Sequence, residues 1–277
     1  MAERTTPGTR VALTIADSDS SGGAGIQGDL KTFTVMNVYG VTVITAITAQ
    51  NTTGVKTSKV LDPELIEKQI EAIASDIDVH GVKTGMLGCA EVIHTVARAV
   101  QRHNLFPLVI DPVMVGKSGD SLIDDAAVRV LCRNLLPLAA VATPNRFEAA
   151  RMLGRAQPIE DLWTAQTAAK ELCKKFKLAA CIVKGIKRPN DEEGEAVDVY
   201  FDGQQEHELV SNWRPTQNTH GAGSTFSAAI TAGLALGQPI DQAIQTAKKV
   251  ISEAIRQTTD LGHGSSPVNP MAYAKVS

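Results

Sequence analysis

The stretch from Asn218 to Thr225 carries the residues best suited to binding a charged group. Gly221 and Gly223 flank Ala222, and a long run of small residues with helical spacing follows Ser224. Glycines let the backbone turn sharply and approach a ligand, and the first N–H groups of a helix lack intrahelical partners. Together these features predict an anion site suited to a phosphate. A glycine-rich loop that only begins a packed helix would look the same, so the rest of the chain must decide.

Three charged residues elsewhere each follow a hydrophobic run, and they supply other groups that phosphoryl transfer needs. That reaction depends on cations and N–H groups around the moving phosphoryl group, a held metal ion and an in-line acceptor. Asp111 and Glu148 could hold Mg²⁺ through its water shell, because this ion takes few carboxylates directly. Lys184 could lie on the nucleotide phosphates as a compact positive charge. Alone, each could be a cap, a first-turn helix acid or a solvated strand end; together they favour a phosphoryl-transfer site.

Hydrophobic runs alternate with helical patterns along the chain, and this alternation predicts the elements that position those groups. The expected strands cover residues 11–16, 41–47, 82–87, 108–110, 139–142 and 179–183, with a hairpin of residues 196–201 and 206–210 around Asp202-Gly203. The expected helices begin near residue 26 and after residue 224, and cover residues 63–76, 90–102, 124–136, 161–176 and 240–256. The pattern predicts a doubly wound α/β fold with a mostly parallel sheet sandwiched by helices. The polar strand ends then meet along one edge of the sheet.

The composition sets the class of protein in which this site is expected. With 277 residues, 43% of them hydrophobic, the chain can form a full core, and we expect one domain over residues 1–277 with residues 1–9 as a flexible N-terminus. A net charge of −3 and 4% aromatic residues give no sign of nucleic-acid binding. No run nears the ~20 apolar residues that span a membrane. The polar start and four scattered cysteines favour a cytoplasmic protein with free thiols.

Several stretches, taken in order, resemble one known family. They cover residues 18–27, 29–33, 48–52, 83–87, 111–115, 117–120, 143–145 with Glu148, and 218–221. Through them nearly the whole chain resembles the ribokinase superfamily, and within it the hydroxymethylpyrimidine and phosphomethylpyrimidine kinases of thiamine biosynthesis. The resemblance implies a kinase that depends on ATP and Mg²⁺ and is commonly a homodimer. Its substrate would be a heteroaromatic alcohol, 4-amino-5-hydroxymethyl-2-methylpyrimidine, and then the monophosphate of that alcohol.

The resemblance also implies roles for individual residues. Gln50 would hydrogen-bond the aminopyrimidine edge, because a buried amide can offer such an edge one donor and one acceptor. Met86 and Val113 would pack on the ring, and Asp29 would line the site. The nucleotide and metal side would be formed by Asn145, Glu148, Lys184, Asp111 and Gly223. The transfer step would be carried by Gly221, Ala222, Gly223, Ser224 and Lys184.

Two positions depart from the family pattern, and both fall at the expected substrate pocket. The loop from Gly221 to Gly223 runs into Ser224, where the family has a cysteine and where pyridoxal and sugar kinases have an aspartate. The family's Ile-Ala-Gly turn after the first strand is here Ile15-Ala16-Asp17. A carboxylate there adds bulk and charge where glycine lets the pyrimidine approach the backbone. The departures leave the expected fold and ATP binding in place, but they leave the substrate and the rate open.

Two alternatives to an active pyrimidine kinase therefore stay open. A pyridoxal or pyridoxine kinase fits the same resemblance, since its substrate is also a heteroaromatic methanol. A weakly active or non-catalytic pyrimidine-binding protein would keep the pocket without the turnover. ADP release with each alcohol separates the two kinases, whereas shifts in melting temperature without turnover would favour the binding protein.

Overall fold

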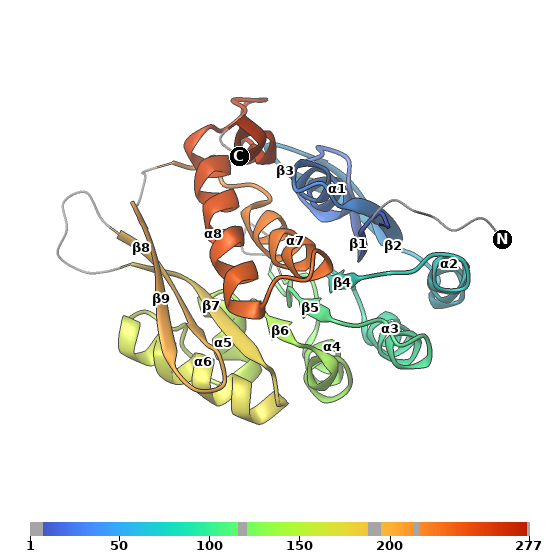
Figure 1. Ribbon diagram of the computed structural model, residues 1–277, viewed down its shortest axis with the longest axis horizontal. Coiled ribbons are helices and arrows are strands. Elements are labelled where there is room, and N and C mark those ends of the chain that lie inside the picture. The colour runs from blue at the N-terminus through green and yellow to red at the C-terminus, as the bar shows by residue number, and fades with distance from the viewer. Residues whose placement is uncertain (1–7, 116–120, 188–194, 213–215, 276–277) are drawn as a thin grey trace.

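The computed structural model describes residues 8–115, 121–187, 195–212 and 216–275, and its centre is a nine-stranded sheet (Figure 1). The strands are β1 (Val11–Asp19), β2 (Tyr39–Asn51), β3 (Gly54–Val60), β4 (Gly81–Thr84), β5 (Leu108–Ile110), β6 (Val141–Ala142), β7 (Ala180–Lys187), β8 (Glu195–Phe201) and β9 (Glu206–Asn212). Their spatial order is β3-β2-β1-β4-β5-β6-β7-β8-β9. The strands from β2 to β7 in this order run parallel, and β3, β8 and β9 are antiparallel additions at the two edges. The predicted mostly parallel sheet is confirmed.

Helices cover both faces of this sheet. They are α1 (Gly25–Val35), α2 (Pro63–Ala74), α3 (Ala90–Arg102), α4 (Asp125–Val130), α5 (Arg146–Leu153), α6 (Leu162–Phe176), α7 (Ala222–Ala235) and α8 (Ile240–Arg256). Buried residues of α1, α7 and α8 form a hydrophobic cluster on one face, whereas α2 to α6 cover the other (Figure 1). Because helices cover both faces of the sheet, the central strands are continuous runs of hydrophobic residues and do not alternate between hydrophobic and polar residues.

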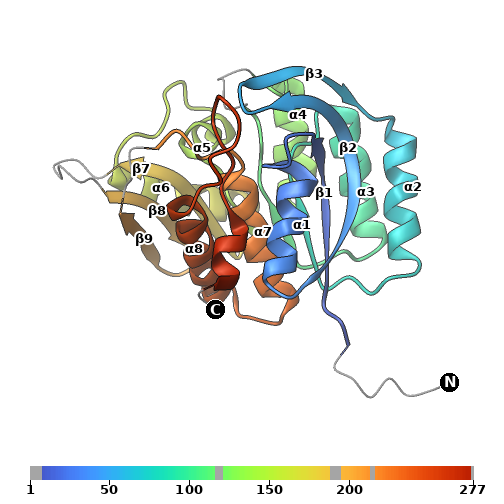
Figure 2. The same ribbon diagram turned by 90° about the horizontal axis from the view of Figure 1, so that it is seen from above.

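The first strand, β1, lies at the point where the winding of the sheet reverses. The chain adds β2 on one side of β1 and β4 on the other, and open α/β sheets bind ligands in the crevice beyond such a reversal. Figure 2 shows β2 and β3 curving past α1 at this side of the molecule. β1 extends to Asp19 because its backbone pairs with β2 as far as Thr48. The polar residues after Ala16, which the sequence places in a turn, therefore begin inside the strand.

Other elements also differ from the sequence prediction. The sequence does not predict β3, because its residues are exposed along its length and no hydrophobic alternation marks it. The short helix α5 also lacks a long apolar pattern. The helix expected over residues 124–136 is α-helical only to Val130 and continues as a π-helical turn, Leu131–Leu135, and a 3₁₀ turn, Leu136–Leu138. The predicted C-terminal loop ends in a 3₁₀ turn, Pro270–Lys275.

Two expected segments lie mostly or wholly outside the described residues: the N-terminus over residues 1–9, of which only 8 and 9 are described, and the loop over residues 117–120. The hairpin of β8 and β9 is confirmed. In its turn, Oδ1 of Asp202 accepts hydrogen bonds from the N–H groups of Gln204 and Gln205 at 2.8 and 2.7 Å. Within the described ranges, no helix has both the length and the apolarity needed to cross a bilayer.

Candidate active site

The carboxylate that follows β5 is joined to the residue directly after β6 and to a residue of β7. Asp111 is only 3% exposed. Its Oδ1 accepts hydrogen bonds from Thr143 Oγ1 at 3.1 Å and from Lys184 Nζ at 2.9 Å. Burial opposes the charge of the Lys184 ammonium, but Asp111 and Glu148 raise its pKa above the ordinary value. The structure thus brings together three residues that the sequence assigns to the nucleotide and metal side.

An irregularity in β7 aims Lys184 at Asp111. The pairing of β7 with β8 joins Val183 to Val199 and then Ile186 to Val197, so Lys184 and Gly185 together oppose a single residue, Asp198. Gly185 has a φ of +80°, and its N–H donates to Asp198 Oδ1 at 2.9 Å. Bulges of this kind redirect side chains and are frequent beside active sites. The sequence predicts the lysine at a strand end, but not the bulge that orients it.

A capping box places Glu148 near the same cluster. The Asn145 side chain accepts the N–H of Glu148 at 2.9 Å, and Glu148 Oε2 accepts the N–H of Asn145 at 2.8 Å. Glu148 Oε1 accepts the N–H of Met114 at 3.3 Å. Burial raises the pKa of Glu148 to about 7, with Lys184 lowering it and Asp111 raising it further. Both residues therefore have a structural role in starting α5, whatever they bind.

The N-terminus of α7 lies against the Asp111–Lys184 pair. Gly221 is the N-cap residue, with a φ of +77°. In the described part of the chain, the N–H groups of Gly223 and Ser224 have no hydrogen-bond acceptor. A Cβ on Gly223 would lie 3.4 Å from both Asp111 Oδ2 and Lys184 Nζ. The geometry expected of an anion site is present: free N–H groups, a helix start and a lysine ammonium converge on one place.

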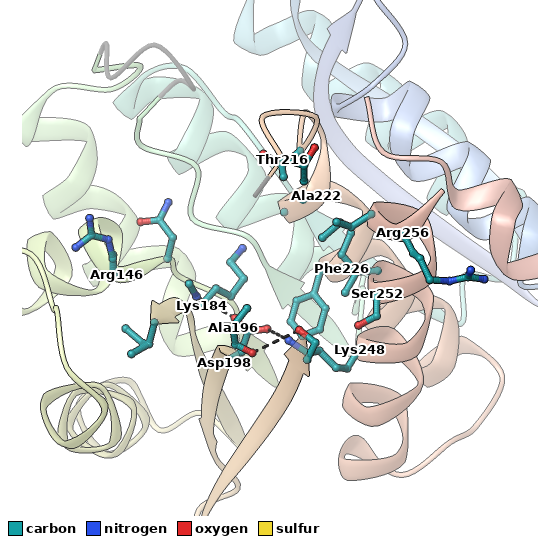
Figure 3. A pocket seen from close by; sticks show the side chains of 18 of the residues that line it. Arg146, Lys184, Ala196, Asp198, Thr216, Ala222, Phe226, Lys248, Ser252 and Arg256 are labelled. Atoms are coloured by element: carbon teal, nitrogen blue, oxygen red, sulfur yellow. Dashed lines mark hydrogen bonds and ion pairs between the residues drawn. The ribbon is translucent and has the colours of Figure 1, made fainter. Parts of the chain in front are cut away.

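A pocket of about 910 Å³ opens beside this helix start (Figure 3). Its wall includes Asn145, Lys184, Ala222 and Gly223, together with residues of β8 and α8. Figure 3 shows Arg146 and Lys184 on one side of the pocket and Phe226 and Arg256 on the other. Sites for small molecules and cofactors commonly measure roughly 300–1,000 Å³. The expected substrate-side residues are not part of its wall.

A second group of polar residues joins the end of β1 to the loop before α7. His220 Nε2 lies 2.7 Å from Asp19 Oδ2 and 3.4 Å from the Gln50 side-chain amide. Asp19 also accepts the N–H groups of Ser21 at 2.8 Å and Ala24 at 2.9 Å. Burial opposes ionisation of Asp19, but His220, Ser21 and the Ala24 N–H hold its pKa well below the usual range. Asp19 is thus an ionised centre for the first glycine-rich loop, which covers residues 20–24 between β1 and α1.

The two glycine-rich loops touch backbone to backbone at this point. A Cβ on Gly221 would overlap the carbonyl of Gly23, and a Cβ on Gly23 would overlap the His220 ring. Glycine is therefore required at both positions for close approach, and at Gly221 also for its left-handed backbone. The contact fixes the start of α7 relative to the end of β1.

The remaining substrate-side residues are more dispersed. Asp29 has no exposed surface; it is paired with Lys83 Nζ at 2.6 Å and accepts a hydrogen bond from Thr14 Oγ1 at 2.6 Å. Burial raises the pKa of Asp29, against the influence of Lys83. The expectation that Asp29 lines the site is corrected: both carboxylate oxygens are engaged inside the core. Met86 is largely buried and Val113 is partly exposed, each directly after a central strand.

The two residues that depart from the family pattern are both partly exposed. Burial raises the pKa of Asp17 to about 6, although its backbone N–H lowers it. The Asp17 carboxylate is not hydrogen-bonded to Ser224, and both residues lie in the described part of the chain. Their shared pocket therefore stays a prediction.

Sequence reasoning missed two ion pairs that position the site, Asp19–His220 and Asp198–Lys248, the latter 2.7 Å long. A histidine directly before one glycine-rich loop and an aspartate inside the other were available signals. Nothing in their spacing links them, because 201 residues separate the partners. Among the described residues, no three metal-ligating side chains cluster around one point.

Known proteins with similar sequences indicate the family to which this chain belongs. The family model for phosphomethylpyrimidine kinase matches residues 19–269. A hydroxymethylpyrimidine/phosphomethylpyrimidine kinase of Rhizobium meliloti (strain 1021) is 44% identical over 263 residues, which cover 94% of this chain and 97% of that protein. The thiamine biosynthesis bifunctional protein ThiED of Geobacter sulfurreducens is 45% identical over 263 residues. That match covers 95% of this chain and 52% of the relative, so the chain spans about half the length of that protein.

Solved structures show the same fold. An ADP complex of Bacillus subtilis pyridoxal kinase matches with a TM-score of 0.88 and 38% identity, over 96% of this chain and 98% of that one. A phosphomethylpyrimidine kinase from Clostridium difficile 630 matches with a TM-score of 0.76 and 40% identity, over 88% of this chain and 99% of that one. The matched residues span both glycine-rich loops and every strand end described above. The chain therefore belongs to the phosphomethylpyrimidine kinase family, with the ribokinase-like fold that the sequence predicts.

Proposed function

We propose that this protein transfers the γ-phosphoryl group of ATP to 4-amino-5-hydroxymethyl-2-methylpyrimidine, to its monophosphate or to both, as part of thiamine diphosphate biosynthesis. One observation carries the chemistry: the Asp111–Lys184 pair lies against the free N–H groups of α7, beside a pocket of about 910 Å³. The choice of substrate draws on the family and on relatives whose names state this activity.

In this proposal the nucleotide occupies the pocket and its γ-phosphate lies at the start of α7. Lys184 and the N–H groups of Gly223 and Ser224 stabilise the charge on the transferred group. The substrate oxygen forms a bond to the γ-phosphorus while the bond to the β–γ bridging oxygen breaks, and ADP leaves. The Ser224 hydroxyl is a poor base near neutral pH. Asp17, whose pKa is about 6, is the candidate acceptor of the alcohol proton.

The two carboxylates predicted to hold Mg²⁺, Asp111 and Glu148, are not equally suited to this ion. Asp111 Oδ2 has no hydrogen-bond partner in the described part of the chain and lies next to Gly223. Both oxygens of Glu148 accept backbone N–H groups, and burial raises the pKa of this carboxyl. We therefore assign the ordering of the ion's water shell mainly to Asp111. When bound with the nucleotide, the ion would neutralise phosphate charge.

A coupled assay for ADP release tests the proposal. Purified protein with ATP and Mg²⁺ should release ADP with the hydroxymethylpyrimidine, with its monophosphate or with both, and removal of Mg²⁺ by EDTA should stop the reaction. Release with pyridoxal alone would favour the second candidate function, pyridoxal kinase, which the TM-score of 0.88 to such an enzyme supports. Ligand-induced stabilisation without any ADP release would favour a binding protein.

The remaining expectations concern the whole protein. We propose that residues 1–277 form a single domain, that the protein is cytoplasmic, and that it assembles as a homodimer. Support for a reducing compartment comes from the four cysteines, all of which are free thiols in the structure. Exposed apolar residues at the β2–β3 edge, Ile47 and Val55, offer a surface for self-association. Light scattering on the purified protein tests the dimer.

A further inference from the structure

His220 contacts groups from two other segments through a single ring nitrogen. Its Nε2 lies 2.7 Å from Asp19 Oδ2, 3.3 Å from Ser21 Oγ and 3.4 Å from the Gln50 amide. The side chain is 11% exposed and packs on Gly23. The backbone is held as well, because the N–H of His220 donates to the Ser266 carbonyl at 3.3 Å and its carbonyl accepts from Val268 at 3.0 Å. The place of this ring is therefore fixed before any ligand binds.

Asp19 decides which form of the ring is present. Four further groups donate to this carboxylate: the N–H groups of Ser21, Gly23 and Ala24, and the Ser21 hydroxyl. It is therefore ionised, and an ionised carboxylate 2.7 Å from a ring nitrogen must receive a proton from it. Nε2 of His220 thus carries a hydrogen and acts as a donor. The Ser21 hydroxyl donates its hydrogen to Asp19 and so presents a lone pair to the ring.

The N–H of His220 in turn fixes the orientation of the Gln50 amide. In the structure the Gln50 NH₂ group faces the ring and Thr48 Oγ1 donates to Gln50 Oε1. An NH₂ group cannot donate to a protonated Nε2, so the carbonyl oxygen is the more favourable atom at this place, where it shares the single Nε2 hydrogen with Asp19. A half-turn of the amide places it there and puts the NH₂ group at the 3.3 Å contact with Thr48 Oγ1. That hydroxyl donates its only hydrogen to the Ser18 carbonyl at 3.1 Å and can therefore accept one. Each donor then meets an acceptor.

We infer that His220, held by Asp19, positions the Gln50 amide so that it presents one N–H and one oxygen lone pair in a fixed order. An amide has two hydrogens and two lone pairs, and one of each is used within the protein. The remaining amide N–H and the remaining oxygen lone pair can bind a heteroaromatic ring that carries an amino group beside a ring nitrogen. The N–H would donate to the ring nitrogen, and the oxygen would accept from the amino group. Pyridoxal has no such edge. This inference rests on the proposed function, and it makes His220 a positioning residue for substrate choice rather than a catalytic one.

The experiment compares two alcohols: 4-amino-5-hydroxymethyl-2-methylpyrimidine and the analogue without the 4-amino group. His220→Phe keeps a ring against Gly23 but removes the N–H. We expect kcat/KM for the amino compound, relative to the analogue, to fall about tenfold, the effect of one misaligned hydrogen bond. The KM for ATP should change by less than about twofold, because Lys184 and the pocket are untouched.

A double-mutant cycle separates positioning from a general structural effect. If His220 acts through Gln50, then His220→Phe combined with Gln50→Ala should lose no more preference than Gln50→Ala alone. His220→Gln, which can keep a donor near Asp19, should retain more of the preference than His220→Phe. His263→Phe is the matched control, since His263 is an exposed histidine of the C-terminal loop, and it should leave the preference unchanged.

The outcomes distinguish this inference from the proposed function. Three outcomes would each overturn the inference while the kinase activity stands. They are additive losses in the double mutant, an unchanged preference for the amino compound in folded His220→Phe, and a parallel rise in the KM for ATP. If His220→Phe fails to fold, equal preferences in His220→Gln and the wild type support the inference, and a lost preference contradicts it. Absence of turnover by the wild-type protein with either compound contradicts the proposed function itself.

Discussion

The proposed nucleotide half and the proposed substrate half of this site are held together by different means. In the nucleotide half, Asp111, Glu148 and Lys184 are positioned by strand ends, a capping box and a bulge, and their charges lie in one cluster. In the substrate half, Gln50 and His220 are positioned by hydrogen bonds between the ends of β1 and β2 and the loop before α7. The first half depends on secondary structure and the second on tertiary contacts. Changes in one half should therefore affect its own ligand first.

The largest expected effect comes from removing the ammonium of the nucleotide half. Lys184→Ala should lower kcat by about 10²–10³-fold, the usual loss for a group that stabilises transition-state charge. Lys184→Arg should not restore the rate fully, because a planar fork does not replace a compact ammonium. Steady-state kinetics and the melting temperature check both variants. Normal kinetics in Lys184→Ala would remove this residue from the proposed mechanism.

The contact between the halves can be broken at Gly221. Gly221→Ala should destabilise the protein by at least ~2 kcal/mol, because the new Cβ adds overlap with Gly23 to the strain of a left-handed backbone. Gly237→Ala is the matched control: its φ is +84°, but no atom lies within 4 Å of the new Cβ. Urea denaturation of both variants gives the difference. Equal losses in the free energy of unfolding would mean that the loop contact contributes nothing.

Gln50→Ala should affect the substrate half alone. The loss of a buried hydrogen-bonding partner should weaken binding of the hydroxymethylpyrimidine by roughly 1–3 kcal/mol. The affinity for ATP should barely change, because Gln50 is not part of the pocket wall. Calorimetric titration with each ligand measures both values. An equal loss for ATP would show that Gln50 supports the fold and that the two halves are not separable.

The two departures from the family pattern should have smaller effects. Ser224→Cys should raise the rate on the hydroxymethylpyrimidine by up to about 10²-fold, because a thiol ionises far more readily than a hydroxyl and its thiolate can accept the alcohol proton. Asp17→Gly should lower the KM for this alcohol by opening the pocket, and it should also lower kcat because it removes the candidate proton acceptor. If Ser224→Cys lowers the rate and Asp17→Gly abolishes it, the natural pair is a working alternative to the family cysteine and glycine.

A further expected effect is a change in how stability depends on pH. Burial raises the pKa of Glu148 from 4.5 to about 7, so the folded protein holds this proton more tightly than the unfolded chain. The resulting stability is fully present below pH ~4.5 and is lost as the pH rises through ~7. Glu148→Gln should flatten this part of the stability profile, as measured by urea denaturation at several pH values. A slope identical to that of the wild type would show that Glu148 is ionised throughout.

Local patterns were enough to predict that the residues of the proposed nucleotide half lie close together. Asp111 and Lys184 follow hydrophobic runs that form parallel strands, and such strands end at one edge of a sheet. The order Asn145 to Glu148 matches a capping box, which involves neighbours in sequence only. Asp29 shows the limit of this approach. The pattern of α1 cannot reveal that Lys83 and Thr14 enclose its carboxylate, because both lie on other elements.

By itself, the sequence determined the parallel strands, the helices that cover them and the glycine-rich loop at the start of α7. These features depend on residues close together in the chain, so periodicity and spacing record them. Only the tertiary structure decided the Asp19–His220 pair, the Gln50 contact and the bulge that aims Lys184. A hydrogen bond between two residues that lie 201 positions apart leaves no periodic trace, since it forms only when the sheet brings the ends of β1 and β2 next to the start of α7.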